Sequence, residues 1–256
     1  MIIDTHCHIY KSEMENAEEI IREAANNDII VILNGTDPES NEEVLELSKK
    51  YENAYAALGY FYTFADEIND ELISQLDNQL NNDKVVAIGE IGLDYYKGKE
   101  NRDKQIELFE KMLALAEKHE LPVIVHSRKS MQDTYDILKR HNLVGSLHSY
   151  QGSAEMAKQF IKLGYCLGVG GTITHSNNKK ARKVLKNVGI SNIVIETDSP
   201  YLPPEGKRGE ENSPINLRYI IGKMAEELDM SEEEIMKITT ENAKRIFKLD
   251  EKYNNR

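Results

Sequence analysis

The hydrophobic positions of the chain fall into short runs separated by longer amphipathic stretches. Eight runs are rich in β-branched and other apolar residues, as expected of buried strands. They cover Ile2–Ile3, Ile29–Leu33, Tyr55–Leu58, Val85–Ile88, Pro122–Val125, Val144–Leu147, Tyr165–Val169 and Ile193–Ile195. The stretches between them repeat apolar residues every three or four positions, which is the spacing of one helix face. These predicted helices are Glu13–Asn27, Pro38–Lys50, Glu67–Asn81, Arg102–His119, Met131–His141, Ser153–Leu163 and Lys179–Val188.

The alternation of strands and helices predicts an α/β fold with a parallel sheet. Parallel strands need a crossover connection, and a helix between each pair of strands supplies it. Eight such units in 256 residues fit a closed (β/α)8 barrel of the TIM type. A doubly wound open sheet is the alternative, but it usually carries a glycine-rich phosphate loop after an early strand, and the sequence has none there. Two extra C-terminal helices, Arg218–Leu228 and Ser231–Phe247, are expected to cover the barrel, which gives one domain over residues 1–256.

Capping residues mark two of the predicted helix starts. Asp37 precedes Pro38, which suits the first helical position, so Asp37 is the expected N-cap. Ser231 and Glu234 have the Ser-x-x-Glu spacing of a capping box. Both signals agree with the starts that the apolar spacing predicts.

Composition narrows the class of protein without identifying it. The chain has 32 Lys and Arg against 44 Asp and Glu, and 40% of its residues are hydrophobic. Cys7 and Cys166 are too few for a disulfide scaffold and are expected to be small core residues. No apolar run approaches the roughly 18 to 20 residues that cross a bilayer, and Met1–Asp4 leads directly into a strand without a signal peptide. We therefore expect a cytoplasmic globular protein with no membrane association and no obligate protein partner.

The formal charge of −12 bears on the binding of nucleic acid. A negative chain repels a polyanion at long range, which argues against broad nonspecific binding. Phosphate-containing substrates remain compatible with this charge, because bound divalent cations reverse the field locally. Charge therefore leaves the function open.

Histidine and acidic residues gather where the predicted strands end. In an extended chain residues two apart share a face, so His6 and His8 point the same way after the first strand. Four more such residues follow the fourth, fifth, sixth and eighth strands: Glu90, His126, His148 and Asp198. The carboxyl ends of barrel strands surround one cavity, so the side chains are expected to meet there. Any one of them alone has an ordinary structural interpretation, and their joint placement is what indicates a metal site.

The other histidines carry a weaker signal. His119 and His141 lie at helix ends and are expected to be structural. His175 follows the seventh strand, and its role stays open at this point.

The number of predicted ligands indicates two ions. A catalytic site for one ion needs about three protein ligands and an open position. We therefore predict that His6, His8, Glu90 and Asp198 hold one ion, and that Glu90, His126 and His148 hold the other, with Glu90 as the bridge. Imidazole and carboxylate donors are compatible with Mg, Mn and Zn.

Four motifs of the chain resemble those of the TatD-type deoxyribonucleases, within the amidohydrolase-like metal hydrolases. They are Asp4–His8, Gly89–Tyr95, Leu121–Arg128 and Glu196–Leu202. The similarity continues through Arg208-Gly209, Asn212 and Pro214 to Asn242–Phe247. The resemblance implies a (β/α)8 barrel and a metal-dependent hydrolase, typically Mg-dependent, with exonuclease activity on DNA. It also implies that the family's metal ligands correspond to the six residues already singled out.

Two departures from the family pattern concern the substrate. After the third strand the family usually shows Gly-x-His-Pro, whereas this chain has Gly59-Tyr60-Phe61-Tyr62. After the eighth strand the family usually has a basic residue just before Asn212, whereas Glu210 and Glu211 stand here. The predicted ligands are intact, so the departures bear on substrate preference and nuclease strength.

The expected reaction is cleavage of a phosphodiester bond by a water that two ions activate. Asp198 is the expected proton acceptor, and Glu90 the catalytic bridging ligand. Arg128 shares a face with His126 and is a candidate for gripping a phosphate of single-stranded or 3′-ended DNA. Weaker substrate candidates lie on loops at the barrel rim: Tyr150, Lys207, Arg208 and Asn212. The aromatic residues 60–62 either stack on an unpaired base or pack their own loop.

Two other functions remain open from the sequence. A small-molecule amidohydrolase or lactonase would use the same metal site, often with a carboxylated lysine after the fourth strand. Glu90 occupies that position here, and Lys84 lies at the other end of the strand. A noncatalytic metal-binding or scaffold protein is the third hypothesis, favoured if residues 60–62 block the cavity.

Overall fold

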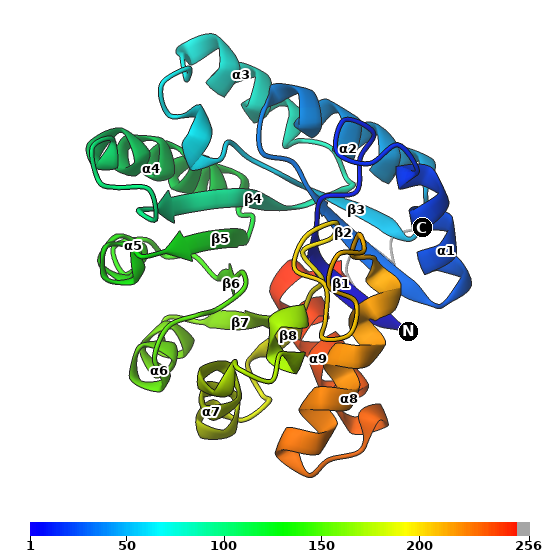
Figure 1. Cartoon of the computed structure of the whole chain (residues 1–256). Helices are drawn as coiled ribbons and strands as arrows, with labels where there is room; N and C mark the ends of the chain where they lie inside the picture. The colour runs from blue at the N-terminus through cyan, green and yellow to red at the C-terminus, as the bar shows by residue number, and fades with distance from the viewer. Residues whose placement is uncertain (250–256) are drawn as a thin grey trace.

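The chain folds into a ring of eight parallel strands in sequence order (Figure 1). The computed structural model describes residues 1–249, so residues 250–256 of the predicted domain lie outside the described residues. The strands are β1 (Ile2–Cys7), β2 (Ile29–Asn34), β3 (Ala54–Leu58), β4 (Val85–Asp94), β5 (Val123–Arg128), β6 (Gly145–Leu147), β7 (Tyr165–Val169) and β8 (Ile193–Ile195). The (β/α)8 barrel predicted from the sequence is confirmed.

The ring closes between β1 and β8 at the carboxyl ends of these strands. Within residues 1–249 no strand ladder joins β1 to β8. Instead, the His8 amide donates to Ser199 O at 2.6 Å, and the Asp198 amide donates to His6 O at 2.9 Å. The same bonds that close the barrel therefore set the relative positions of three predicted metal ligands.

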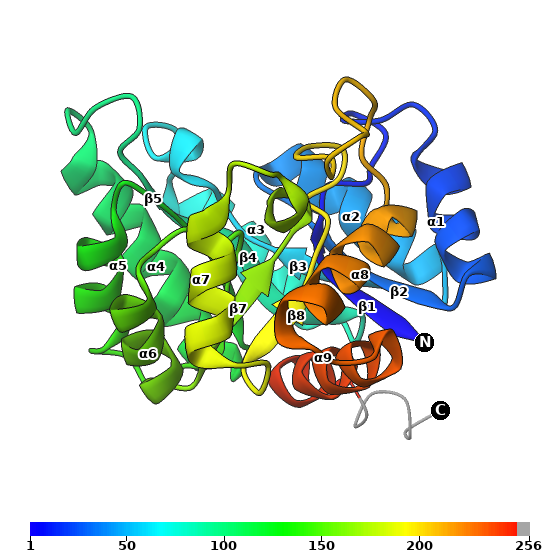
Figure 2. The same ribbon diagram turned by 60° about the horizontal axis from the view of Figure 1, so that its bottom comes forward.

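Helices surround the strands on the outside of the ring (Figures 1 and 2). They are α1 (Ala17–Asn26), α2 (Pro38–Lys50), α3 (Asp70–Gln79), α4 (Arg102–His119), α5 (Met131–Leu138), α6 (Ala154–Lys162), α7 (Lys179–Val188), α8 (Leu217–Leu228) and α9 (Glu232–Phe247). Short 3-10 turns are η1 (Tyr62–Phe64), η2 (Gly171–Thr174) and η3 (Pro214–Asn216). The bounds predicted for α2, α4 and α7 agree with the structure.

The first and third helices begin later than predicted. The amides of Glu13 and Met14 both donate to Tyr10 O, so this segment forms a turn before α1. The Asn69 side chain accepts from the Leu72 amide at 3.0 Å, which caps α3 at its observed start. In both cases the residues before the helix continue its apolar spacing, so the sequence predicts a longer helix. A local hydrogen bond gives these residues a non-helical conformation instead.

Strand β4 is longer than predicted, so Glu90 lies inside a strand and does not follow its end. Ile88 pairs with Val123 and Ile91 pairs with Val125, so between these pairs β4 contains one residue more than β5. Such a β-bulge turns side chains from their regular alternation and is frequent beside active sites. The bulge gives a physical reason why a residue within the strand faces the mouth of the barrel.

The capping signals of the sequence are confirmed. The Asp37 side chain accepts from the Ser40 amide at 2.9 Å at the start of α2. The Ser231 hydroxyl accepts from the Glu234 amide at 3.2 Å, and Glu234 returns a bond to the Ser231 amide. Each pair satisfies helix-start donors that the helix itself leaves unbonded.

Helix α9 closes the end of the barrel opposite the metal ligands. It lies across the end at which β1 begins (Figure 2), and the Thr240 hydroxyl donates to Met1 O at 3.4 Å. Its buried side chains share a core with the strand side chains that point into the barrel. Members of this core are Ile3, Ile32, Tyr55, Val86, Ile124, Val194, Ala243, Ile246 and Phe247. The predicted cover formed by a C-terminal helix is therefore confirmed.

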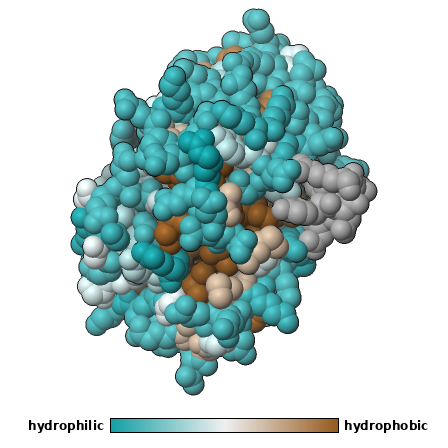
Figure 3. All heavy atoms as spheres, turned by 90° about the vertical axis from the view of Figure 1, so that its right-hand side faces the viewer, coloured by the Kyte–Doolittle hydropathy of each residue, from teal (hydrophilic) through white to brown (hydrophobic). Residues whose placement is uncertain are grey.

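The face of the molecule shown in Figure 3 is hydrophilic over most of its area, with apolar residues gathered near its middle. Among residues 1–249, no helix combines the length and the apolar character needed to cross a bilayer.

Candidate metal centre

The two histidines of β1 converge as the sequence predicts. The His6 Nε2 and His8 Nε2 atoms lie 3.0 Å apart, and both rings are buried. The other nitrogen of His8, Nδ1, lies 2.9 Å from the carbonyl oxygen of Asn34, the last residue of β2. That carbonyl fixes the ring so that Nε2 faces the centre.

Glu90 lies between two pairs of histidines. Its Oε2 is 3.6 Å from His6 Nε2 and 3.3 Å from His8 Nε2. Its Oε1 is 3.0 Å from His126 Nδ1 and 3.9 Å from His148 Nε2. One carboxylate thus offers one oxygen to each pair, which is the arrangement expected of a bridging ligand.

Asp198 completes the cluster from the loop after β8. Its Oδ1 is 3.4 Å from His6 Nε2, and its Oδ2 is 3.8 Å from His148 Nε2. Its backbone φ is +60°, a left-handed conformation that costs a non-glycine residue about 1–3 kcal/mol. The hydrogen bond from the Asp198 amide to His6 O holds the residue in this conformation.

The donor atoms form three overlapping groups in which all ligand atoms lie within 4.8 Å of one another. The groups are His6, His8 and Glu90; His6, His148 and Asp198; and Glu90, His126 and His148. Imidazole nitrogens and carboxylate oxygens without thiolates suit Mg, Mn and Zn, so the donor set fits a divalent metal. The structure brings together all six residues predicted as ligands.

Charge within the cluster is strongly coupled. Burial and the neighbouring His148 lower the pKa of His6. Burial also favours neutral His148, but Glu196 and Asp198 outweigh it and raise the pKa of His148 to about 10. Burial opposes the ionisation of Glu90, yet the surrounding histidines, His6 foremost, hold the pKa of Glu90 well below its usual range. Protonated imidazoles therefore neutralise the carboxylates when no cation is bound, and a divalent cation can replace that positive charge.

Two further carboxylates stand behind the histidines of the second pair. Asp94 Oδ2 lies 3.1 Å from His126 Nε2, on the opposite side of the ring from Glu90. Glu196 Oε1 lies 2.9 Å from His148 Nδ1 and accepts a hydrogen bond from the Ser149 amide. A carboxylate behind a ligating histidine orients the ring and raises its basicity. Neither carboxylate was predicted from the sequence to have this role, although both lie within the motifs that carry the resemblance.

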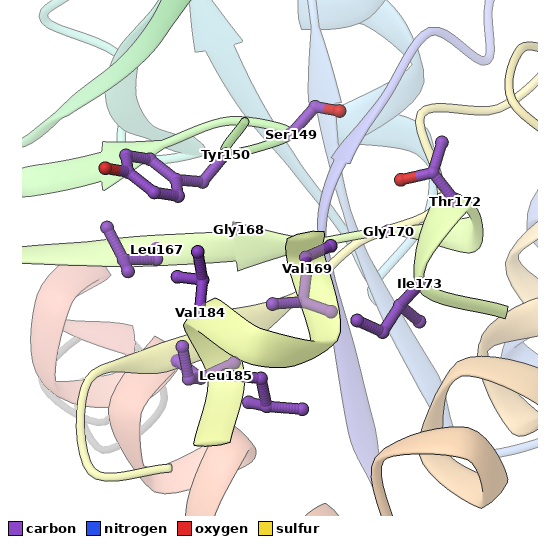
Figure 4. A pocket seen from close by; sticks show the side chains of 12 residues that line it. Ser149, Tyr150, Leu167, Gly168, Val169, Gly170, Thr172, Ile173, Val184 and Leu185 are labelled. Carbon is purple, nitrogen blue, oxygen red and sulfur yellow. The ribbon is translucent and has the colours of Figure 1, made fainter. Parts of the chain in front are cut away.

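Glu196 depends on the lack of a side chain at Gly168 of β7. A Cβ added there would lie 2.3 Å from Glu196 Oε2, closer than atoms can approach. Next to Gly168 is a cavity of about 20 Å³, between β7, α7 and Ser149 and Tyr150 (Figure 4). This volume holds about one water molecule, so the cavity is too small for a substrate.

A larger cavity of about 250 Å³ opens at the metal centre. It is lined by His126, Ser127, Arg128, His148, Ser149, Gln151, Asp198, Tyr201 and Leu202. Arg128, at the end of β5, stacks over the ring of Tyr96 at 3.7 Å from its centroid. Within residues 1–249 no carboxylate lies within ion-pair distance of Arg128, so its charge faces a cavity that contains three predicted ligands.

The other predicted substrate residues differ in their availability. Tyr150 is largely buried and its hydroxyl donates to Ser153 O at 2.8 Å. Arg208 is exposed and lies 3.8 Å from Glu205, while Lys207 pairs with Glu210 at 2.8 Å. These carboxylate partners would compete with any anionic ligand for the basic side chains.

Asn212 is buried and hydrogen-bonded within its own loop. It is 1% exposed, and its amide nitrogen donates to Thr197 O and Tyr201 O, both at 2.8 Å. Its Oδ1 accepts from Asn216 Nδ2 at 2.9 Å. The side chain of Asn212 is thus bonded within the loop after β8, and its contact with a substrate stays a prediction.

The aromatic segment after β3 divides into a buried and an accessible part. Tyr60 is buried, and its hydroxyl donates to Leu72 O at 2.8 Å. Phe61 contacts the ring of His126 edge-on at 5.0 Å between centroids, and Tyr62 stacks on it at 6.3 Å. Tyr60 thus packs its loop, whereas Phe61 and Tyr62 form a partly exposed wall against a predicted metal ligand.

The remaining histidines and the cysteines lie outside the cluster. His119 Nε2 is 2.7 Å from Asp77, and His141 Nε2 is 2.8 Å from Glu110, as expected of structural residues. The His175 ring lies 3.0 Å from Pro203 O in the loop after β8. Cys7 and Cys166 are buried and unpaired, as predicted.

Comparison with known proteins gives a consistent result. A family model described as TatD related DNase matches residues 3–248. A Bacillus subtilis protein named uncharacterized metal-dependent hydrolase YabD is 36% identical over 255 residues, covering 98% of this chain and 100% of that protein. The crystal structure of YjjV, a TatD homologue from Escherichia coli, superposes with a TM-score of 0.90 at 32% identity, over 96% of this chain and 98% of that one. An organophosphorus hydrolase from Deinococcus radiodurans shares the fold alone, with a TM-score of 0.64 at 11% identity over 96% and 92% of the chains.

Proposed function

The chain belongs to the TatD-related DNase family of metal-dependent hydrolases, and we propose that it cleaves phosphodiester bonds of DNA with two divalent ions, as an exonuclease-type enzyme. The preferred substrate is single-stranded or 3′-ended DNA, and Mg is the expected metal, with Mn or Zn as alternatives.

The observation that carries the proposal is the position of Glu90. Its two carboxylate oxygens face different pairs of histidines, at 3.3 Å from His8 and 3.0 Å from His126. Six convergent ligand residues, Glu90 and five others, exceed the need of one ion. Two-ion sites are common among enzymes that cleave phosphodiester bonds.

Each ion would have its own set of ligands. His6, His8, Glu90 and Asp198 would hold one, and Glu90, His126 and His148 the other. When bound, such ions lower the pKa of a water and stabilise negative charge on the leaving oxygen.

In this proposal Asp198 accepts the proton of the attacking water. Its carboxylate lines the cavity. Burial opposes its ionisation, but His148 and His6 outweigh that effect and lower the pKa of Asp198. An ionised carboxylate that faces the reaction cavity meets both requirements of a general base, geometry and charge.

In this proposal Arg128 holds the phosphate that is attacked. A guanidinium binds a phosphate through two parallel hydrogen bonds, which fixes its orientation as well as its position. The stacking of Arg128 on Tyr96 restricts the motion of the guanidinium without consuming its charge.

The proposal is tested with purified protein and labelled single-stranded DNA. Cleavage is expected with Mg or Mn and is expected to stop in EDTA. Glu90→Ala should abolish cleavage with the fold retained, while Glu107→Ala, which removes an exposed glutamate of α4, should keep it. Cleavage that persists in EDTA, or no cleavage with any of the three metals, would contradict the proposal.

The same samples decide between a nuclease and a small-molecule hydrolase. Lys84 cannot supply a carboxylated bridge, because its Nζ donates to Tyr51 O and Ala54 O at the opposite end of the barrel. Turnover of lactones or amides without turnover of DNA would nevertheless establish that alternative.

A further inference from the structure

A second groove continues from the metal cavity over the loops after β6 and β7. Its volume is about 380 Å³, and it shares Gln151 with the cavity at the metal centre. Figure 4 shows Ser149 and Thr172, which come from these two loops, on the same side of β7. The polar residues that line the groove are Gln151, Thr172, His175, Asn177, Asn178 and Lys180.

The lining of this groove contains no acidic residue, in a chain with 44 Asp and Glu. The Lys180 ammonium donates to Gln151 O at 2.6 Å, which leaves two of its three donors for a ligand. No carboxylate among residues 1–249 lies within ion-pair distance of Lys180. At the edge of the groove, Glu205 accepts from the Ser176 amide and lies 3.8 Å from Arg208, so its charge is partly compensated.

A groove elsewhere on the barrel shows the contrast. Between α1 and α2 lies a larger groove of about 860 Å³, whose lining includes five glutamates: Glu15, Glu18, Glu19, Glu43 and Glu46. Lys11, Arg22 and Lys50 line it as well, so its net charge is 3 − 5 = −2, which disfavours a polyanion. Of these two grooves, the one that joins the metal cavity is therefore also the one whose charge admits a phosphate chain.

Neutral donors accompany Lys180. The amide side chains of Gln151 and Asn177 are exposed and have no hydrogen-bond partner within residues 1–249. Helix α7 begins at Lys179, and Asn178 caps it by accepting from the Ala181 amide at 3.2 Å. The preceding amides, of Lys179 and Lys180, have no acceptor within the helix, and a helix start favours negative charge. The cation, the free amides and the helix start thus meet in one groove.

We propose that this groove is a subsite for the sugar–phosphate backbone of the substrate strand, beyond the bond that is cleaved. Lys180 contacts a phosphate there, and Gln151 separates that phosphate from the reacting one. This inference rests on the proposed nuclease function and extends it. The groove would make the enzyme sensitive to the length of its substrate, since a short diester does not reach past Gln151.

Kinetics on substrates of different length test the proposal. Bis(p-nitrophenyl) phosphate and single-stranded DNA of two, four and eight nucleotides are compared with wild type, Lys180→Ala and Lys183→Ala. Lys183 lies one turn further along α7, is exposed and does not line the groove, so it controls for charge alone. In the wild type, kcat/KM should rise with length. In Lys180→Ala, the ratio of kcat/KM for the eight-mer to that for the small diester should fall about three- to tenfold, whereas Lys183→Ala should keep the wild-type ratio.

Direct binding gives a readout that does not need catalysis. Binding of a labelled phosphorothioate eight-mer is measured by fluorescence anisotropy in EDTA at several salt concentrations. Loss of one phosphate contact lowers the slope of log affinity against log salt by about 0.7 for a single strand. Lys180→Ala should show this decrease, and Lys183→Ala should not.

The outcomes separate the two proposals. If the wild type cleaves the small diester but Lys180→Ala keeps the wild-type length ratio and salt slope, the subsite is refuted and the phosphodiesterase stands. If the wild type cleaves no diester, the nuclease function fails, and the anisotropy experiment still decides whether the groove binds a strand. Equal losses in Lys180→Ala and Lys183→Ala would show general charge attraction and would also overturn the subsite.

Discussion

The carboxylate behind His148 offers the most direct test of how this centre is built. Glu196 is completely buried, and its Oε1 lies 2.9 Å from His148 Nδ1. Glu196→Gln keeps the size and shape of the side chain and removes its charge. We expect weaker metal binding, because a neutral amide stabilises less positive charge on the ring and the ion beyond it.

The loss of metal-binding free energy in Glu196→Gln has an upper limit and an expected range. Unit charges 2.9 Å apart interact by about 6 kcal/mol at an effective dielectric constant of about 20. In the metal-bound protein the positive charge lies on the ion, farther from Glu196 than the ring nitrogen is. Loss of a hydrogen-bonded partner behind a ligand typically lowers metal affinity 10- to 100-fold, which corresponds to about 1.4–2.7 kcal/mol.

The assay is a calorimetric titration of the EDTA-treated protein with Mn or Zn. In Glu196→Gln, a metal at the predicted ligand His148 should bind about 10- to 100-fold more weakly. In the absence of metal, the pKa of His148 measured by NMR should fall from about 10 toward its ordinary value, since Glu196 is the foremost charge that raises it.

Glu227→Gln is the matched control, because Glu227 is also mostly buried but pairs with Lys186 at 2.8 Å on the outer helices. It should leave both metal affinities unchanged. Metal affinities of Glu196→Gln within twofold of wild type, with the fold retained, would refute the orienting role of Glu196.

Three further predictions follow from the packing. Gly168→Ala should reproduce the loss of metal affinity seen in Glu196→Gln, because its Cβ would displace Glu196 Oε2; titration of the folded variant checks this. Phe247→Ala should lower the free energy of unfolding by about 3–5 kcal/mol by leaving a cavity at the closed end of the barrel, with metal affinity kept, as urea unfolding and titration would show. Burial raises the pKa of Tyr60 to about 12, so its share of stability is complete below about pH 10 and lost as the pH rises toward 12. Tyr60→Phe should therefore reduce the decline in stability between pH 10 and 11.5, at the cost of about 1 kcal/mol for the bond to Leu72 O at neutral pH.

The sequence was sufficient to predict the barrel and its six candidate ligands for one physical reason. In a parallel barrel all strands run the same way, so a residue that follows any strand lies at the same mouth. The place of a residue after a strand in the sequence therefore predicts where its side chain lies in the barrel, even when no side-chain contacts are known. His126, separated from His6 by more than a hundred residues, nevertheless shares Glu90 with it.

The direction of the strands does not predict local irregularities within a strand. The β-bulge of β4 lies between Ile88 and Ile91, and it makes Glu90 a residue within a strand. Gly92 contributes, because its φ is +133° and a Cβ would lie 2.1 Å from His126 O. Apolar spacing indicates which residues are buried, but it does not indicate where a β-bulge adds one residue to a strand relative to its neighbour.

Asn212 shows why loop residues are hard to assign from sequence. A polar residue on a rim loop is equally suited to a substrate and to the loop's own backbone. The backbone after β8 turns sharply, with φ of +60° at Asp198 and +48° at Leu202, and leaves carbonyl groups that no strand or helix bonds. Buried carbonyl groups need donors, and Asn212 supplies them.

The two pairs of histidines in the centre differ in the charge of the groups that contact the far side of each ring. His126 and His148 each have a carboxylate on the far side of the ring, Asp94 and Glu196, whereas His8 has only the carbonyl of Asn34. A carboxylate partner makes an imidazole a stronger donor than a carbonyl does. The half that contains His126 and His148 therefore has the more basic imidazoles, and these two rings line the cavity at the metal centre together with Asp198.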